Sequence, residues 1–240
     1  MRIYLIVALL ASYSSAFAVA IPKEVTKTAK SLTYLLRGNP SLDRIRKTPV
    51  AGLYEATLGS NIIYITANGK HFILGEIYRT NGTVNLTENR RNRMRMQAIN
   101  AIDESEMVVF APKRETKYTV NVFTDVDCGY CAKFHKEVPF LNRAGVKVRY
   151  LAFPRAGKGS DTYNTMVSVW CADDQQKAMT DAKNRRKVKD KTCNHPIDKL
   201  YSLGQNIGVT GTPALVLPNG KLLPGYIPYY QLIPYLQQAK

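Results

Sequence analysis

Residues suited to metal sites and acidic residues are both scarce in this sequence. Its 240 residues include 4 cysteines and 3 histidines, and 34 lysines and arginines face only 18 aspartates and glutamates, for a formal net charge of +16. His71, His135 and His195 are scattered, and no second pair repeats the short spacing of Cys128 and Cys131. A structural zinc site needs four ligands at characteristic spacings. The sequence therefore predicts no metal and no other cofactor.

Long apolar runs are also missing beyond residue 20. The start of the chain is different, because Arg2 precedes an apolar run from Ile3 to Ala11, and "SSAFAVA" offers Ala-x-Ala cleavage sites after Ala18 or Ala20. This pattern is typical of a secretory signal, and the run is shorter than the roughly 20 apolar residues that span a bilayer. We predict a signal peptide over residues 1–20, with an uncleaved anchor as the alternative. Export would place the cysteines in an oxidising space where disulfides persist.

The excess of positive charge raises nucleic acid or an anionic membrane surface as a partner. The clearest basic run, "NRRNRMRM" at residues 89–96, has no interleaved aromatic residue on which a base could stack. Export also argues against a nucleic acid. We interpret the run as a solvated helix face and predict no nucleic-acid partner.

The first part of the chain reads as a small domain over residues 21–82. Apolar residues at helical spacing predict an amphipathic helix within residues 22–40, and three strand-like segments follow at 52–59, 61–67 and 71–78. Asn68-Gly69 between the last two is a strong hairpin turn. A unit of this size has a thin core and exposed sheet edges, so we predict a homodimer formed through it.

Residues 83–112 are predicted to form a helical linker, with Thr87 as a possible N-cap. The remaining residues, 113–240, alternate strands and helices in the order βαβ and then ββα, with a long helical stretch from about 160 to 205. This order predicts a thioredoxin-like domain with a helical insertion. The fold class is therefore α+β in the first domain and α/β in the second.

The motif Cys128-Gly129-Tyr130-Cys131 lies between a predicted strand and a predicted helix. A staple that closes so small a ring would stabilise the fold little. At a helix N-terminus, unpaired N–H groups and the helix dipole lower the pKa of a thiol, which makes it both a nucleophile and a leaving group. We therefore interpret the pair as redox-active, with Cys128 exposed to the dipole and Cys131 shielded one turn later. His135 is expected on the outer surface of this helix, with a position that faces and tunes the cysteine pair as the alternative.

The other two cysteines, Cys171 and Cys193, enclose a charged segment of about 20 residues. A disulfide that closes such a loop stabilises by roughly 3 kcal/mol in the chain-entropy model. We interpret this pair as a structural disulfide, with two free thiols or a second redox relay as alternatives. Thr212-Pro213 precedes an apolar strand, and the sequence alone leaves its peptide bond in the usual trans form.

Several segments together resemble one family. They are "FTDVDCGYCAKFHKE", "VRYLAFPRAG", "WCADDQQKA", a later cysteine and "GVTGTPALVLPNGKLLPGY". Over residues 119–228 they are similar to the DsbC-type periplasmic protein disulfide isomerases, and the first half matches that family in length and pattern more than in motif.

The resemblance implies a V-shaped homodimer in the periplasm in which Cys128 attacks and Cys131 resolves. It implies that Gly129, Tyr130, Thr212 and a cis Pro213 neighbour the site, and that Cys171 and Cys193 form a structural disulfide. The implied partners are misoxidised exported proteins and a membrane thiol reductase of the Dsb system, which keeps the pair reduced.

Two features depart from the family pattern. Val122 stands where thioredoxins carry a buried aspartate six positions before the first cysteine, so Cys131 needs another group to assist its deprotonation. The strong positive charge also differs from the uncharged cleft of the family, which leaves open a general range of clients or a narrower, acidic set. A dithiol oxidase and a thiol-independent holding chaperone are the alternatives to an isomerase.

Overall fold

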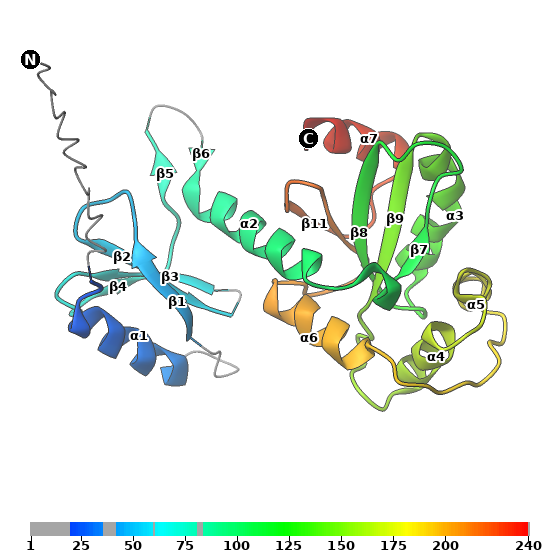
Figure 1. Ribbon diagram of the computed structural model, residues 1–240, viewed down its shortest axis with the longest axis horizontal. Coiled ribbons are helices and arrows are strands. Elements are labelled where there is room, and N and C mark those ends of the chain that lie inside the picture. Colours follow the sequence, from blue (N-terminus) through cyan, green and yellow to red (C-terminus); the bar gives the residue numbers. More distant parts are fainter. Residues whose placement is uncertain (1–19, 36–41, 60, 81–83, 240) are drawn as a thin grey trace, which may run out of the picture.

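The structure is a computed structural model that describes residues 20–35, 42–59, 61–80 and 84–239. The predicted signal peptide therefore lies almost wholly outside the described residues. Figure 1 shows two lobes with helix α2 running between them. The first lobe contains α1, a four-stranded antiparallel sheet in the order β1-β2-β3-β4 and the short β5–β6 pair. Its elements are α1 (Lys23–Leu35), β1 (Leu42–Lys47), β2 (Leu53–Leu58), β3 (Asn61–Thr66), β4 (Phe72–Ile73), β5 (Tyr78–Arg79) and β6 (Val84–Asn85).

The core of the first lobe lies between α1 and its sheet. Val25, Ala29 and Leu32 follow one another at helical spacing and are buried, as the sequence pattern indicates. They pack with buried residues of β2 and β3, which include Ala56, Leu58, Ile63 and Ile65. The predicted Asn68-Gly69 turn joins β3 to β4, and Gly69 has a φ of +66°. A Cβ at Gly69 would lie 2.8 Å from the Glu24 carbonyl oxygen, so the turn packs against the start of α1.

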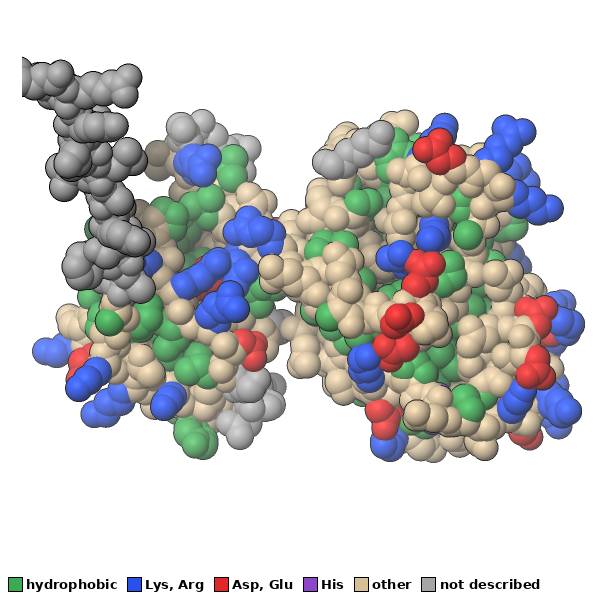
Figure 2. Space-filling view, viewed as in Figure 1, with side chains coloured by type: hydrophobic (Ala, Val, Ile, Leu, Met, Phe, Trp, Pro, Cys, Tyr) green, Lys and Arg blue, Asp and Glu red, His purple; other side chains and the backbone are tan. Residues whose placement is uncertain are grey.

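Basic side chains are prominent on the surface of the first lobe. On the face that Figure 2 shows, Lys and Arg side chains are spread over this lobe with few acidic side chains among them. Strand β1 contributes Arg44 and Lys47, which are both exposed. Part of the net positive charge of the chain is therefore presented to solvent by this lobe.

The second lobe is built on a five-stranded sheet in the order β11-β10-β8-β9-β7, in which β8 and β9 are parallel and the other neighbours antiparallel. Helices α3 and α6 pack against β9, and α7 packs beside α3. The connecting helix is α2 (Leu86–Asn100), and the elements of the second lobe are η1 (Glu104–Glu106), β7 (Val108–Phe110), β8 (Tyr118–Thr124), α3 (Gly129–Arg143), β9 (Val146–Ala152), α4 (Asp161–Trp170), α5 (Gln175–Lys183), α6 (Ile197–Asn206), β10 (Ala214–Val216), β11 (Leu222–Pro224) and α7 (Tyr229–Gln238).

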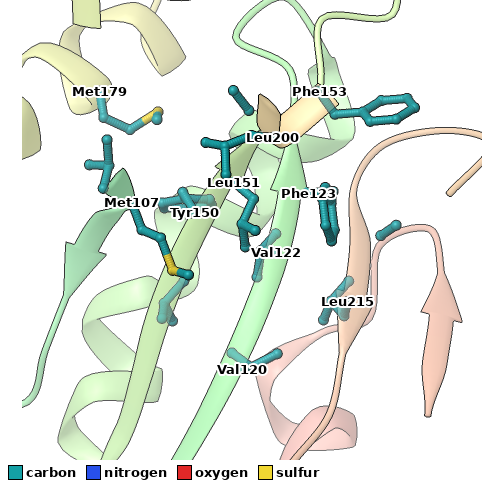
Figure 3. Packing of buried hydrophobic residues seen from close by; sticks show 14 of the residues in the cluster. Met107, Val120, Val122, Phe123, Tyr150, Leu151, Phe153, Met179, Leu200 and Leu215 are labelled. Atoms are coloured by element: carbon teal, nitrogen blue, oxygen red, sulfur yellow. The ribbon is translucent and has the colours of Figure 1, made fainter. Parts of the chain in front are cut away.

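The central strands of this sheet carry the larger of the two cores. Figure 3 shows Val120 and Val122 of β8 beside Tyr150 and Leu151 of β9, with Met179 of α5 and Leu200 of α6 among the residues that cover them. The last five residues of β8, from Val120 to Thr124, are all buried because the strand lies in the middle of the sheet. A rigid β8 therefore fixes where the segment after Thr124, which leads to the cysteines, leaves the sheet.

Several predicted elements differ from the structure. The segment 71–78 is not one strand, because β4 pairs with β3 whereas β5 pairs with β6. The predicted linker of residues 83–112 contains β7, which pairs with β9 and so belongs to the second sheet. The long helical stretch from 160 to 205 is three helices, α4, α5 and α6, with a coil between α5 and α6.

Helix α2 is attached to both lobes by buried arginines. The prediction of a solvated face is wrong for Arg90 and Arg95, which are buried. Arg90 Nε donates to a carboxylate oxygen of Glu55 on β2 at 3.2 Å, and Arg95 Nε donates to the carbonyl oxygen of Ile207 at 3.1 Å. These partners replace the hydrogen bonds that the guanidinium groups would make to water. The basic helix α2 can therefore pack against both lobes.

The start of α2 also differs from expectation. Asn85 is the N-cap, and its side chain accepts a hydrogen bond from the Glu88 N–H, so the prediction of Thr87 is wrong. The Thr87 hydroxyl is buried and bonds to the Tyr64 hydroxyl at 2.6 Å and to the Ile77 N–H at 2.8 Å. The tertiary partners of Thr87 outweigh its capping tendency.

Candidate active site

The CxxC motif begins where the chain leaves β8 and enters α3. In the connecting turn, Asp125 Oδ1 accepts from the Asp127 N–H at 2.8 Å and the Asp125 carbonyl oxygen accepts from the Cys128 N–H at 3.2 Å. Cys128 is the N-cap of α3, and its sulfur accepts from the Cys131 N–H at 3.4 Å. The thiol therefore takes the place of the capping hydroxyl or carboxylate that usually satisfies a free helix N–H group.

This position makes Cys128 a thiolate at neutral pH. Hydrogen bonding to the Cys131 side chain, contact with Thr212, the Cys131 N–H and the charge of Arg155 together lower the pKa of Cys128 to about 5, although burial opposes the shift. An unperturbed thiol has a pKa of about 8.5. Cys128 is therefore mostly in its nucleophilic thiolate form at neutral pH.

Cys131 has the opposite property. It lies one turn into α3, only 1% of its surface is exposed, and burial followed by the hydrogen bond to Cys128 raises its pKa well above the ordinary value. Lys183, the Asp125 backbone and the Thr124 hydroxyl oppose part of this rise. The two thiols of one motif are thus held in different protonation states, with the proton on the inner sulfur.

The other predicted neighbours surround Cys128 as follows. The Thr212–Pro213 peptide is cis and precedes β10, and the Cys128 thiol in its protonated form donates to the Thr212 carbonyl oxygen at 3.2 Å. Tyr130 is 65% exposed and its ring stacks on that of Tyr226. A Cβ built at Gly129 would meet no described atom within 4 Å, so the space in front of the helix end is open.

A buried lysine lies behind the pair, and sequence reasoning missed it. Lys183 ends α5, is 3% exposed, and its Nζ donates to Thr124 Oγ1 at 2.6 Å and to the Asp125 carbonyl oxygen at 2.7 Å. Burial lowers the pKa of Lys183, and the nearby Cys131 and Asp125 oppose the shift. No local pattern marks this residue, since only the tertiary packing of the insertion brings α5 to the end of β8.

The carboxylate of Asp125 was also missed. It is buried and accepts from the Arg155 backbone N–H and from Arg155 Nε, both at 2.9 Å. Arg155 is thereby held where its charge lowers the pKa of Cys128. The alternation of Asp125 and Asp127 just before the motif is the one sequence signal for this arrangement.

His135 does not face solvent, so the expectation of a surface residue is wrong. Its ring is buried, Nδ1 lies 3.0 Å from the Tyr150 hydroxyl, and Nε2 lies 3.0 Å from Thr180 Oγ1. Burial, with a further contribution from Lys183, lowers the pKa of His135 to about 4. A neutral imidazole with both nitrogens in contact ties α3 to β9 and α5.

Cys171 and Cys193 form a disulfide, with a sequence separation of 22 residues. Cys171 caps the end of α4 and Cys193 lies shortly before α6, so the loop they close contains the whole of α5. The bond fixes both ends of the segment that carries Lys183 to the motif.

The side chains at the site suit exchange chemistry between sulfur atoms. Within the described residues, no three His, Cys, Asp or Glu side chains lie together in a way that could hold a metal ion. None of the helices in the described part of the chain is long and apolar enough to cross a bilayer. The groups around the motif are a thiolate, a buried thiol, a buried ammonium and a hydroxyl, which fit thiol–disulfide exchange.

Two protein families match separate parts of the chain. Residues 17–88 match the family described as "Disulfide bond isomerase protein N-terminal domain", and residues 104–240 match the family described as "Thioredoxin-like domain". The second match begins at η1 and so includes β7.

Curated relatives and a solved structure agree with these matches. The thiol:disulfide interchange protein DsbC of Escherichia coli (strain K12) is 40% identical over 237 residues, which cover 98% of this chain and 95% of that protein. Its counterpart in Salmonella typhimurium is 44% identical over 184 residues, or 76% of this chain and 75% of that protein. The structure of a disulfide interchange protein from Neisseria gonorrhoeae, 30% identical, covers 57% of this chain and 98% of its own with a TM-score of 0.51.

Proposed function

The chain belongs to the DsbC family of thiol:disulfide interchange proteins, and on this premise we propose that it rearranges wrong disulfides in exported proteins through a reduced Cys128/Cys131 pair. The observation that carries the proposal is the asymmetry of the pair. Cys128 is a thiolate at the end of α3, with a pKa of about 5, while Cys131 behind it stays protonated. Such a pair presents one nucleophile to a client and keeps the second thiol in reserve.

The reaction begins when the Cys128 thiolate attacks one sulfur of a client disulfide. The client S–S bond breaks, a mixed disulfide forms, and the other client sulfur leaves as a thiolate that takes a proton from solvent. If another client thiolate then attacks the mixed disulfide, Cys128 is released and the client is isomerised with no net change in electrons. If Cys131 attacks instead, the client is reduced and the pair is oxidised.

The second exit requires Cys131 to lose its proton, which ends on the client thiolate that leaves when the Cys128–client bond breaks and the Cys128–Cys131 bond forms. We assign Lys183 and Thr124 to this step as positioning residues, in place of the acid that is absent at Val122. The ammonium of Lys183 lowers the pKa of Cys131, and the Thr124 hydroxyl hydrogen-bonds to that sulfur while it accepts from Lys183. Both interactions favour the thiolate of Cys131 over the thiol.

A reduced pair in an oxidising space needs an electron donor. We propose that the protein is exported to the periplasm and that a membrane thiol reductase of the Dsb system reduces the pair after each reductive turnover. The proposal rests on the secretory pattern of residues 1–20 and on the DsbC relatives.

We further propose that the protein is a homodimer joined through its first lobe. β4 is an edge strand of the first sheet, and its surroundings expose apolar side chains, with Phe72 46% and Leu74 62% exposed. An unpaired, apolar edge favours association with a second copy. If so, Ile73→Lys in the full chain shifts the protein from dimer to monomer in sedimentation velocity, whereas a dimer of unchanged stability would contradict this interface.

The test of the function compares single cysteine variants on a multi-disulfide client whose disulfides have been scrambled. Cys131→Ala should retain some isomerisation and accumulate mixed disulfides through Cys128. In cells quenched with acid and then alkylated, the wild-type pair should be mostly reduced. A pair that is mostly oxidised, with activity limited to forming new disulfides, would identify a dithiol oxidase instead.

A holding chaperone is the remaining alternative, since an isomerase that binds unfolded clients can also prevent their aggregation. The variant Cys128→Ala, Cys131→Ala separates the two activities. Undiminished suppression of aggregation together with no isomerisation by this variant would show that holding is a second function that needs no thiols.

A further inference from the structure

A cavity of about 810 Å³ is lined in part by Cys128 and lies on the side of the helical insertion. Its walls are the start of α3, one face of α4 and the coil that follows α5. The residues that line it and carry charge are Asp127, Lys136, Lys183, Arg185, Arg186, Lys187 and Asp190. The cavity is therefore bounded by five basic residues and two acidic ones, and the proposed nucleophile Cys128 is part of its wall.

The basic residues of this wall differ in whether they already have partners within the protein. Arg186 forms an ion pair with Asp181 at 2.6 Å, and Lys183 is buried against the end of β8. By contrast, Lys136, Arg185 and Lys187 form no ion pair within the described residues. Three cationic groups of the wall thus have no ion-pair partner among the described residues, although Asp127 and Asp190 also line the cavity.

Arg185 has an unusual backbone for an arginine. Its φ is 58°, and it is the one non-glycine residue with positive φ among those that the structure describes. It occupies the position after the C-cap of α5, where the Arg185 N–H bonds to the Ala182 carbonyl and the Arg186 N–H to the Asp181 carbonyl, each at 2.9 Å. This is the Schellman arrangement, in which glycine is the usual residue.

An arginine in this conformation is strained relative to the right-handed region, because its Cβ lies too close to the following carbonyl oxygen. The side chain of Arg185 is exposed and makes no hydrogen bond or ion pair within the described residues that would offset the strain. Retained backbone strain beside a reactive group is a sign of function. Here the strain places a guanidinium at the wall of the cavity that Cys128 lines.

We propose that this cavity, which we call the basic groove, binds an acidic segment of the client next to the disulfide under attack, with Arg185, Lys187 and Lys136 as the groups that contact its carboxylates. The inference rests on the proposed function, because the groove needs a client whose disulfide has reached Cys128. A guanidinium pairs with a carboxylate through two parallel hydrogen bonds, and the cluster of cations raises the rate of encounter with anions. The positive charge of the chain thus has a use in client selection.

The test uses two synthetic peptides that contain one disulfide and differ only in their residues beside it, glutamate in one and glutamine in the other. The measured quantity is the ratio of the second-order rate constants for their reaction with the reduced protein at low ionic strength. We expect the glutamate peptide to react about tenfold faster, and the ratio to fall towards one as salt is added. The ratio should fall in Arg185→Gly and in Lys187→Gln.

Two control measurements distinguish binding in the basic groove from an effect of net charge or of folding. Lys189→Gln removes the same charge from the same coil outside the groove, and its ratio should match the wild type. Arg185→Gly should also raise the midpoint of thermal unfolding, since glycine relieves the strain. A fall in that midpoint would mean that Arg185 serves the fold, and an equal loss of the ratio in Lys189→Gln would mean that only net charge matters.

The outcomes also separate this inference from the function on which it rests. If neither peptide reacts with the wild-type protein, the proposed thiol–disulfide exchange itself is wrong. If both peptides react and their rates are equal, the exchange stands and the basic groove is overturned.

Discussion

The second lobe contains two cysteine pairs whose chemistry is opposite although their side chains are the same. Cys128 and Cys131 lie one helical turn apart as free thiols, and the charge state of each is set by its surroundings. Cys171 and Cys193 are joined and close a loop that contains α5. What distinguishes the pairs is the length of chain between the sulfurs and the presence of a helix N-terminus at one of them.

A small ring gives little stability when it closes, so the Cys128/Cys131 pair can open and close with little change in the fold. Closing a loop of about 20 residues stabilises the fold more, so the Cys171–Cys193 disulfide is expected to remain intact. The two pairs are also connected, because the closed loop carries Lys183 to the back of Cys131. The structural disulfide thus supports the reactive pair through α5.

The largest expected effect comes from removing the nucleophile. Cys128→Ala should reduce isomerisation of a scrambled client to the uncatalysed rate, because no thiolate remains to form the mixed disulfide. The assay is recovery of client activity over time, with Cys171→Ser, Cys193→Ser as the comparison. Substantial turnover by Cys128→Ala would show that the reactive thiol lies elsewhere.

For stability, in contrast to activity, the larger effect is expected from the Cys171/Cys193 pair. Cys171→Ser, Cys193→Ser should lower the free energy of unfolding by about 3 kcal/mol, since it frees a loop of about 20 residues. Denaturant unfolding of the wild type and the variant gives this difference directly. Reduction of the Cys128/Cys131 disulfide alone should change the free energy of unfolding much less. An equal loss of stability on opening either disulfide would contradict the difference proposed between the two pairs.

A smaller effect should follow from Lys183→Met. Without the ammonium, the Cys131 thiolate is less favoured, so resolution of the mixed disulfide should slow by about tenfold and its pH midpoint should move upward. Rapid-quench measurement of the mixed disulfide across pH reports both changes. Lys177→Met, on the exposed side of the same helix, is the matched control, and an unchanged pH midpoint in Lys183→Met would contradict the assignment.

A further effect concerns the dependence of stability on pH. The pKa of Cys128 is about 5 in the folded protein and about 8.5 in an unfolded chain, so between these values the unfolded reduced chain binds more protons. The stability of the reduced protein relative to the oxidised one should therefore rise with pH across this window, by at most about 1.4 kcal/mol per pH unit, and be lost as pH falls through 5. A difference that is independent of pH would contradict the low pKa.

Much of this arrangement could be predicted from local patterns. The strand before Cys128, the helix after it and the turn at Gly69 follow from apolar periodicity and turn residues, and each depends on neighbours in the chain. The short ring and the long loop likewise distinguish the two cysteine pairs by counting alone.

The rest depends on contacts between distant segments. Arg90 and Arg95 look solvated in a basic run, yet they are buried because partners arrive from β2 and from Ile207. His135 looks like a surface residue of α3 until β9 and α5 pack over it. Lys183 carries no signal at all, since its role appears only when the insertion folds back on the end of β8.

The proposed chemistry depends on the unequal protonation of Cys128 and Cys131, and their separate titration tests it most directly. The reduced protein is alkylated at a series of pH values for short times, and mass spectrometry of the peptides gives the rate at each cysteine. We predict a midpoint near pH 5 for Cys128 and little reaction of Cys131 until strongly alkaline pH. Two thiols that both titrate near their ordinary value of about 8.5 would contradict this difference and the mechanism built on it.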